Sequence, residues 1–150
     1  MEKVKEVPYG VADFVTVMEQ NLYYVDKTMF IPELEKQPRN LFFIRPRRFG
    51  KSIFLSMLHS YYDCNQSAKF QSLFGNLWIG QHPTELQGKY QVLFLDFSQV
   101  SGNIDSLERN FDFYCSVKLD GFIRRYGESY SEETREKVRK AEYAMDKLAF

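Results

Sequence analysis

The chain has 150 residues, a length that fits one domain of ordinary size with its own hydrophobic core. Hydrophobic residues make up 44% and charged residues 27%, which is the balance of a soluble globular protein. Lys and Arg number 20, and so do Asp and Glu, so the formal net charge is zero. This balance argues against general electrostatic adhesion to nucleic acid or to anionic membranes, and any phosphate recognition must come from a local cluster of charge.

The N-terminus and the two cysteines predict a cytoplasmic protein with reduced thiols. Residues 1–8 are charged and lack the apolar core of a signal peptide. The longest apolar runs have the length of a strand, far short of a membrane span. Cys64 and Cys115 have no metal-type spacing, and we expect neither to form a disulfide.

The first third of the chain predicts short elements. Residues 13–21 read as a short helix, and residues 22–25 as a strand-like run. Asp26 stands where an N-cap would, ahead of a helix through about Glu35 that Pro38 ends. Residues 41–44, Leu-Phe-Phe-Ile, form a short apolar run between polar neighbours, which predicts a buried strand.

The rest of the chain predicts mostly helix. Gly50 precedes a helix over about residues 51–63 whose apolar side chains nearly encircle it, so we expect it to be covered on most sides. Residues 70–79 suggest a short helix and a turn, and residues 92–95 a second buried strand. A long helical stretch follows Gly102 and ends near Gly127.

A last helix begins after Ser131, with an apolar stripe of Val138, Ala141, Met145 and Leu148. Two buried strands separated by a helical crossover predict an α/β fold with a parallel sheet. Because residues 148–150 remain apolar and carry no stop signal, we expect residues 1–150 to be the N-terminal portion of a larger domain.

One segment, between the first predicted strand and its helix, carries chemistry. It reads, in order, Arg45, Pro46, Arg47, Arg48, Phe49, Gly50, Lys51 and Ser52. The phosphate loop of nucleotide-binding proteins, G-x-x-x-x-G-K-[ST], occupies the same context. Gly50 lets the backbone approach an anion, and the first amides of the helix are unpaired donors. Lys51 would reach the β- and γ-phosphates, and the Ser52 hydroxyl would hold Mg²⁺.

The loop departs from that pattern at its first position, where Arg45 replaces the glycine of the tight turn. The three arginines add positive charge that an anion would compensate. The alternative interpretation is a strand-to-helix turn whose arginines pair with surface acids.

The string F-I-R-P-R-R-F-G-K-S over residues 43–52 resembles the phosphate loop of the bacterial AAA-ATPase-like family of P-loop proteins, in which arginine at the first-glycine position is the usual variant. Four further segments resemble other parts of that family in the same order: residues 8–14, 24–28, 73–79 and 92–98. The resemblance spans roughly the first hundred residues.

This resemblance implies a parallel-sheet, P-loop NTPase-like three-layer core that binds ATP and Mg²⁺, with Lys51 as the catalytic lysine. Members commonly continue into a region similar to PD-(D/E)XK nucleases. They also carry a later acidic strand that orients Mg²⁺ and water, and no such string occurs in this sequence. We therefore expect residues 1–150 to bind nucleotide but to be incomplete for hydrolysis.

Other polar residues have competing interpretations. Asp96 follows the second predicted strand and is either a Mg²⁺-linked acid or, as we favour, a structural residue at the strand end. Asp26, Lys27 and Thr28 either contact the base or ribose or form a helix cap. His59 and His82 are too few for a metal site, and Cys64 is poorly aligned with His59 for a nucleophilic pair.

Three functions follow from these patterns. The leading one is the ATP/Mg²⁺-binding domain of a regulatory or signalling ATPase, whose partners are the nucleotide and further parts of the same protein. The second is a non-catalytic module that binds a phosphate of nucleic acid for an attached nuclease, which the zero net charge does not support. The third is a degenerate loop kept as a scaffold for protein contacts.

Overall fold

A computed structural model describes residues 4–38, 40–46, 48–141 and 143–148, without the side chains of Met145 and Leu148. The chain divides into two compact units, Met1–Gln91 and Val92–Phe150. Each unit has its own hydrophobic cluster, and each is described by itself.

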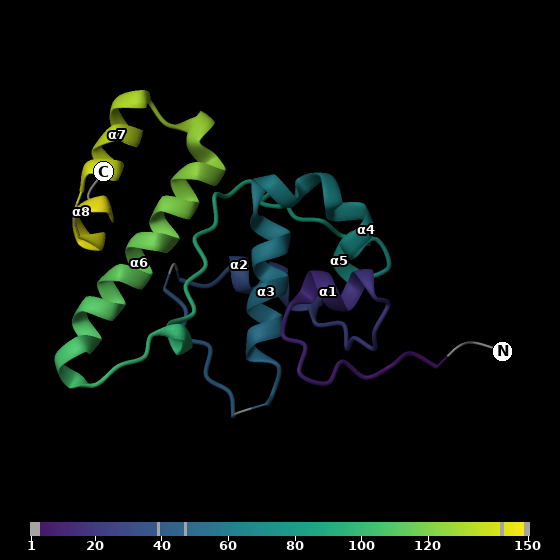
Figure 1. The fold of residues 1–150 in the computed structure, drawn as a ribbon. Coiled ribbons are helices and arrows are strands. Elements are labelled where there is room, and N and C mark those ends of the chain that lie inside the picture. Colours follow the sequence, from purple (N-terminus) through teal and green to yellow (C-terminus); the bar gives the residue numbers. More distant parts are fainter. Residues whose placement is uncertain (1–3, 39, 47, 142, 149–150) are drawn as a thin grey trace. The chain divides into compact units, whose positions relative to one another are not determined.

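The first unit is a set of short helices around α3 (Figure 1). In chain order, its elements are α1 (Phe14–Glu19), the 3-10 helix η1 (Thr28–Phe30), α2 (Ile31–Glu35), α3 (Lys51–Tyr62), the 3-10 helix η2 (Cys64–Lys69), α4 (Phe70–Phe74) and α5 (Trp78–Gln81). The predicted helices at 13–21, 26–35, 51–63 and 70–79 are therefore present, two of them divided into shorter pieces.

An aromatic cluster holds this unit together. Phe14 of α1 stacks on Phe74 of α4 with ring centroids 4.9 Å apart, and Tyr61 of α3 meets Phe74 edge-on at 5.6 Å. All three side chains are fully buried, and such pairs contribute beyond their buried area. The buried residues of α3 are Phe54, Met57, Ser60 and Tyr61. Ile53, Leu58 and Tyr62 pack partly buried against the same core, and within α3 only Ser52 and Leu55 are exposed, so the expectation that α3 is covered on most sides is confirmed.

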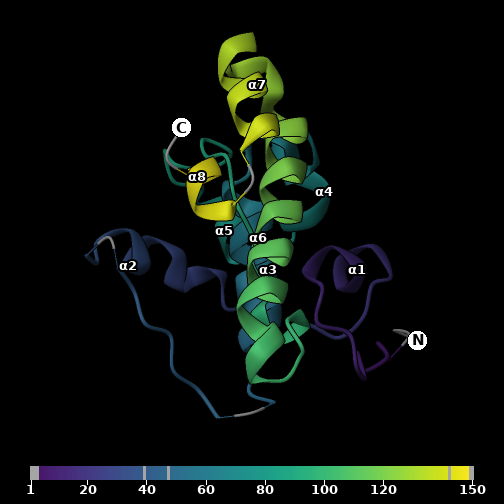
Figure 2. The ribbon, with the colours of Figure 1, turned by 60° about the vertical axis from the view of Figure 1, so that its left-hand side comes forward.

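The second unit is built on one long helix. Its elements are the 3-10 helix η3 (Phe97–Gln99), α6 (Ile104–Tyr126), the 3-10 helix η4 (Gly127–Ser129), α7 (Glu132–Lys140) and α8 (Ala144–Leu148). Helix α8 lies alongside α6 (Figures 1 and 2), where the Asp112 carboxylate accepts from the Ala144 amide at 2.8 Å. The expected last helix thus breaks at Ala141, whose ψ of 128° is extended.

The predicted α/β fold with a parallel sheet is wrong. Within the described residues, the β-type pairing is limited to an isolated parallel bridge between Asp63 and Tyr90. The runs at 22–25, 41–44 and 92–95 form no strand. Leu41, Phe42 and Ile44 are 52%, 92% and 89% exposed, which no buried strand would be.

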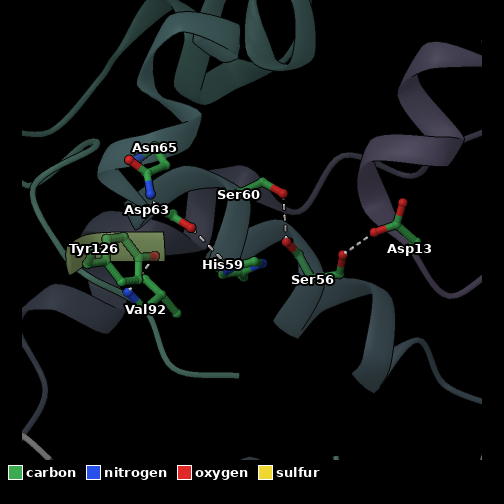
Figure 3. Close-up of polar contacts among 8 residues, drawn as sticks. All are labelled: Asp13, Ser56, His59, Ser60, Asp63, Asn65, Val92 and Tyr126. Carbon is green, nitrogen blue, oxygen red and sulfur yellow. Dashed lines mark hydrogen bonds and ion pairs between the residues drawn. The ribbon is translucent and has the colours of Figure 1, made fainter. Parts of the chain in front are cut away.

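The backbone of residues 92–96 is bonded to α6 instead of to a neighbouring strand. The Tyr126 hydroxyl accepts from the Val92 amide at 3.1 Å (Figure 3), and the Tyr114 hydroxyl accepts from the Asp96 amide at 2.7 Å. Buried backbone groups need partners, and side-chain hydroxyls serve this segment in place of a β-ladder. The P-loop NTPase-like three-layer core is therefore absent from the described structure.

Candidate functional site

Residues 45–52, which we call the basic loop, lead into the first turn of α3. Arg48 and Gly50 have left-handed backbone, with φ of 65° and 75°. Gly50 is the N-cap of α3 and offers no side-chain cap, whereas Asp13, Asn103 and Ser131 cap α1, α6 and α7 through side-chain oxygens. The first amides of α3 therefore receive no hydrogen bond from a capping side chain and carry the positive end of the helix dipole.

The basic loop is closed by its own lysine. The Lys51 ammonium donates to the Arg45 carbonyl at 2.9 Å, and the Phe49 amide donates to the Pro46 carbonyl at 3.4 Å. The bend is therefore held by a bond that joins its two ends.

Four cationic residues lie in or beside the basic loop: Lys27, Arg45, Arg48 and Lys51. The Arg45 guanidinium lies over the Phe43 ring, 5.3 Å from its centroid, and Arg48 is exposed. A Cβ built on Gly50 would lie 3.7 Å from Lys27 Nζ, so a second ammonium besides that of Lys51 approaches the loop. Arg47 lies outside the described residues. No ion pair to a described residue involves these four cations, and like charges gathered at one bend favour an anion between them.

Two cavities in the described part of the first unit border the basic loop. One, which we call the aromatic cavity, measures about 430 Å³, and the other, the N-terminal cavity, about 350 Å³. Both cavities are lined by Lys27, Phe49, Gly50 and Phe54. The aromatic cavity alone is lined by Phe30, Glu33, Leu34, Gln37, Phe43 and Arg45. The N-terminal cavity alone is lined by Val7, Pro8, Tyr23, Tyr24, Val25, Arg48 and Ile53. No pattern in the sequence indicated either cavity, because residues distant in the chain form both.

Asp26 and Thr28 have structural roles. One Asp26 carboxylate oxygen accepts from the Thr28 amide and hydroxyl at 2.8 and 2.7 Å, and the other accepts from the Trp78 amide at 2.7 Å. The Thr28 hydroxyl accepts from the Ile79 amide at 3.1 Å. Both side chains therefore fix the start of α5. Lys27, between them, is the member of this trio that faces the basic loop.

Ser52, the expected Mg²⁺ ligand, is exposed on the first turn of α3. No cluster of three or more His, Cys, Asp or Glu that could hold a metal occurs among the described residues. Mg²⁺ that arrives with a nucleotide needs few protein ligands, because phosphate oxygens and water supply most of its octahedral shell.

Asp96 belongs to the second unit and caps η3. Its carboxylate accepts from the Ser98 hydroxyl at 2.7 Å and from the Ser98 amide at 3.1 Å. These hydrogen bonds lower the pKa of Asp96. The structure thus favours the structural interpretation of this residue.

A polar group lies away from the loop, along the middle and end of α3 (Figure 3). His59 Nε2 is 3.2 Å from an oxygen of Asp63, whose side chain is 1% exposed. The Ser56 hydroxyl donates to Asp13 at 3.0 Å, and the Ser60 hydroxyl donates to the Ser56 carbonyl at 3.0 Å. This group connects α1 to α3 and ties α3 to the turn that follows it.

Comparison with known proteins decides the family. The family model of the AAA-ATPase-like proteins, described as predicted AAA-ATPase, matches residues 8–148 of the chain. The chain belongs to this family. The family predicted from the sequence is thereby confirmed, and membership of the AAA-ATPase-like family supports a general ATPase nature and suggests nucleotide use.

One relative of this AAA-ATPase-like chain is an uncharacterized protein in the vnfD 5′ region of Azotobacter chroococcum mcd 1. The two are 43% identical over 63 residues, which cover 41% of this chain and 12% of the relative. The chain thus spans a small part of that relative's length. No solved structure matches the chain. None of the described helices combines the length and the apolar character that crossing a bilayer requires.

Proposed function

We propose that the basic loop binds the phosphates of a purine nucleoside triphosphate, ATP with Mg²⁺, and that the chain is the nucleotide-binding part of a regulatory or signalling ATPase. The observation that carries the proposal is the start of α3. There the glycine-opened helix offers amides without a side-chain cap, the Lys27 ammonium approaches Gly50, and Arg45, Arg48 and Lys51 lie in the loop itself. Family membership supports the same conclusion.

Each loop residue has an assigned part in this proposal. The amides after Gly50 bind phosphate oxygens, Lys51 binds the β- and γ-phosphates, and Ser52 ligates the Mg²⁺ that the nucleotide brings. Arg45 and Arg48 supply positive charge, and Pro46 and Phe49 shape the bend. Arg47 adds a further positive charge to the sequence of the loop. Hydrolysis requires an acidic group that orients water, and this assignment gives no loop residue that role. We therefore expect residues 1–150 to bind ATP and to hydrolyse little.

The test is thermal unfolding of the whole chain with and without millimolar MgATP. A ligand at a hundred times its Kd adds about 2.7 kcal/mol to the free energy of unfolding. At ~2–4 °C per kcal/mol for a chain of this size, the Tm should rise by several degrees. Lys51→Ala should abolish the rise. Lys89→Ala removes an exposed lysine of the first unit that lines neither cavity and should leave the rise intact.

Two results would contradict the proposal. One is an unchanged Tm with MgATP, and the other is an equal rise in wild type and Lys51→Ala. If short DNA bound with a steep salt dependence while MgATP caused no rise, the basic loop would instead serve as a nucleic-acid phosphate site.

A further inference from the structure

The aromatic cavity has the size and the walls of a site for a planar ring. Its volume of about 430 Å³ lies within the range of small-molecule pockets. The Phe43 ring forms part of one wall, and the Arg45 guanidinium and the Phe54 ring pack against it. Arg45 lies 5.3 Å from the Phe43 centroid, and Phe43 lies 5.0 Å from Phe54 at an interplanar angle of 26°.

Two aromatic side chains around this cavity are exposed without an evident structural reason. Phe30 and Phe49 are 52% and 60% exposed, and they come from two different segments of the first unit. Exposed apolar side chains that converge on a cavity indicate a ligand that covers them. A flat heteroaromatic ring would bury these faces by stacking.

The two cavities are alike in positive charge and differ at Gln37. Both are lined by Lys27 and by one arginine each, Arg45 in the aromatic cavity and Arg48 in the N-terminal cavity. The aromatic cavity is also lined by Gln37, whose side-chain amide donates and accepts and so can bond the ring nitrogens and the amino group of a purine, and by Glu33, whose carboxylate already accepts from the Lys36 ammonium at 2.8 Å. Lys27 and Gly50 line both cavities where these meet the basic loop. If the phosphates bind at this junction, the aromatic cavity is available for the base.

We propose that the aromatic cavity binds the purine base of the nucleotide, with Phe30 and Phe49 covering its faces and Gln37 bonding its edge. This inference rests on the proposed function, because it places the base relative to phosphates held by the basic loop. It gives the site a preference for nucleotides over simple polyphosphates, and it assigns residues that the loop motif does not contain.

The experiment compares MgATP with magnesium tripolyphosphate, which carries the phosphates without base or sugar. Binding to the whole chain is measured by titration calorimetry. Wild type should bind MgATP more tightly than tripolyphosphate. Phe30→Ala should weaken MgATP binding roughly tenfold, since stacking on an aromatic side chain is typically worth about that factor, and should leave tripolyphosphate binding unchanged.

Tyr23→Ala is the matched control. Tyr23 is 54% exposed, close to the 52% of Phe30, and it lines the N-terminal cavity alone. This variant should bind both ligands as wild type does. Gln37→Ala tests the base edge at an exposed position where folding is not at risk, and it should weaken MgATP but not tripolyphosphate. Unfolding without ligand checks that each variant is folded.

Failure of this inference and failure of the proposed function give different results. Equal wild-type affinity for the two ligands, or unchanged MgATP binding in both Phe30→Ala and Gln37→Ala, would overturn the base assignment and leave the phosphate site standing. A selective loss of MgATP binding in Tyr23→Ala would move the base to the N-terminal cavity. Absence of binding by either ligand would overturn both proposals.

Discussion

Asp13 shows how one side chain serves two helices. One carboxylate oxygen accepts from the Thr16 amide and hydroxyl at 2.8 and 2.7 Å, which caps α1. The other accepts from the Ser56 hydroxyl of α3 at 3.0 Å (Figure 3), and Ser56 in turn accepts from the Phe14 amide at 3.0 Å. Asp13, the N-cap of the six-residue helix α1, is thereby bonded to α3, the helix that follows the basic loop.

We predict that Asp13→Ala lowers the Tm of the chain by about 3–10 °C. Loss of an N-cap costs roughly 1 kcal/mol, and loss of the bond to Ser56 adds to that cost, at ~2–4 °C per kcal/mol. Asp13→Asn keeps a capping oxygen and should lose less. Thermal unfolding followed by circular dichroism measures both variants. An alanine variant as stable as wild type would contradict the assigned role.

The same residue makes stability depend on pH. Burial raises the pKa of Asp13, but hydrogen bonds from Thr16 and Ser56 outweigh it, so the pKa lies below 3.8 in the folded chain. The charged carboxylate therefore adds stability that is complete above pH 3.8 and is lost as the pH falls through the lower folded value. The Tm difference between wild type and Asp13→Asn should accordingly shrink in acid.

The site residues divide into those that sequence reveals and those that it does not. The basic loop was recognisable because its residues are contiguous and their chemistry is local. Phe30 and Gln37 carry no motif, and their place beside Phe43 depends on how α2 packs. Lys27 was singled out with its neighbours, but its approach to Gly50 is a tertiary contact that no spacing encodes.

At the scale of elements, the start of α3 depends on a glycine in left-handed conformation. Gly50 has φ 75° and ψ 23°. A Cβ there would meet Ile53 Cγ2 at 3.5 Å and Lys27 Nζ at 3.7 Å, which are ordinary contacts. The conformation, and not the available space, is therefore what opposes a side chain.

We predict that Gly50→Ala lowers the free energy of unfolding by about 1–2 kcal/mol, the cost of left-handed backbone for an L-residue. Gly121→Ala is the matched control, because Gly121 lies inside α6 and a Cβ there meets nothing within 4 Å. That change should instead stabilise the chain by up to about 1 kcal/mol. Urea unfolding measures both. The same sign for the two variants would contradict the assigned conformation of Gly50.

The helices were largely predictable, and the sheet was not. Helical periodicity extends over many residues in α3 and α6, and caps such as Asp13 and Ser131 mark where helices begin. A four-residue apolar run has no such signature. The apolar run at residues 92–95 predicts a strand. In the structure, however, the backbone amides of Val92 and Asp96 donate to the hydroxyls of Tyr126 and Tyr114, and the run itself does not specify these partners.

For the whole molecule, the division into two units has a functional meaning. The core cluster of α1, α3 and α4 lies entirely before Gln91, and so do the basic loop and both cavities beside it. The second unit has its own small cluster around Cys115 and Leu119. Nothing that the proposed nucleotide site uses comes from residues after Gln91.

We therefore predict that a chain of residues 1–91 folds cooperatively and keeps the Tm rise with MgATP. Circular dichroism during heating measures the transition, and the same protein with Lys51→Ala is the control for the ligand effect. If residues 1–91 fold but show no rise while the whole chain does, the second unit contributes to the site.

The bond between Lys51 and the Arg45 carbonyl uses only part of the capacity of the ammonium. An ammonium has three N–H donors, so two remain for a phosphate while the third keeps the loop closed. In the proposed site the same side chain therefore holds the bend together and offers positive charge at its mouth. A variant without the amine would lose the closure of the loop together with the phosphate contact.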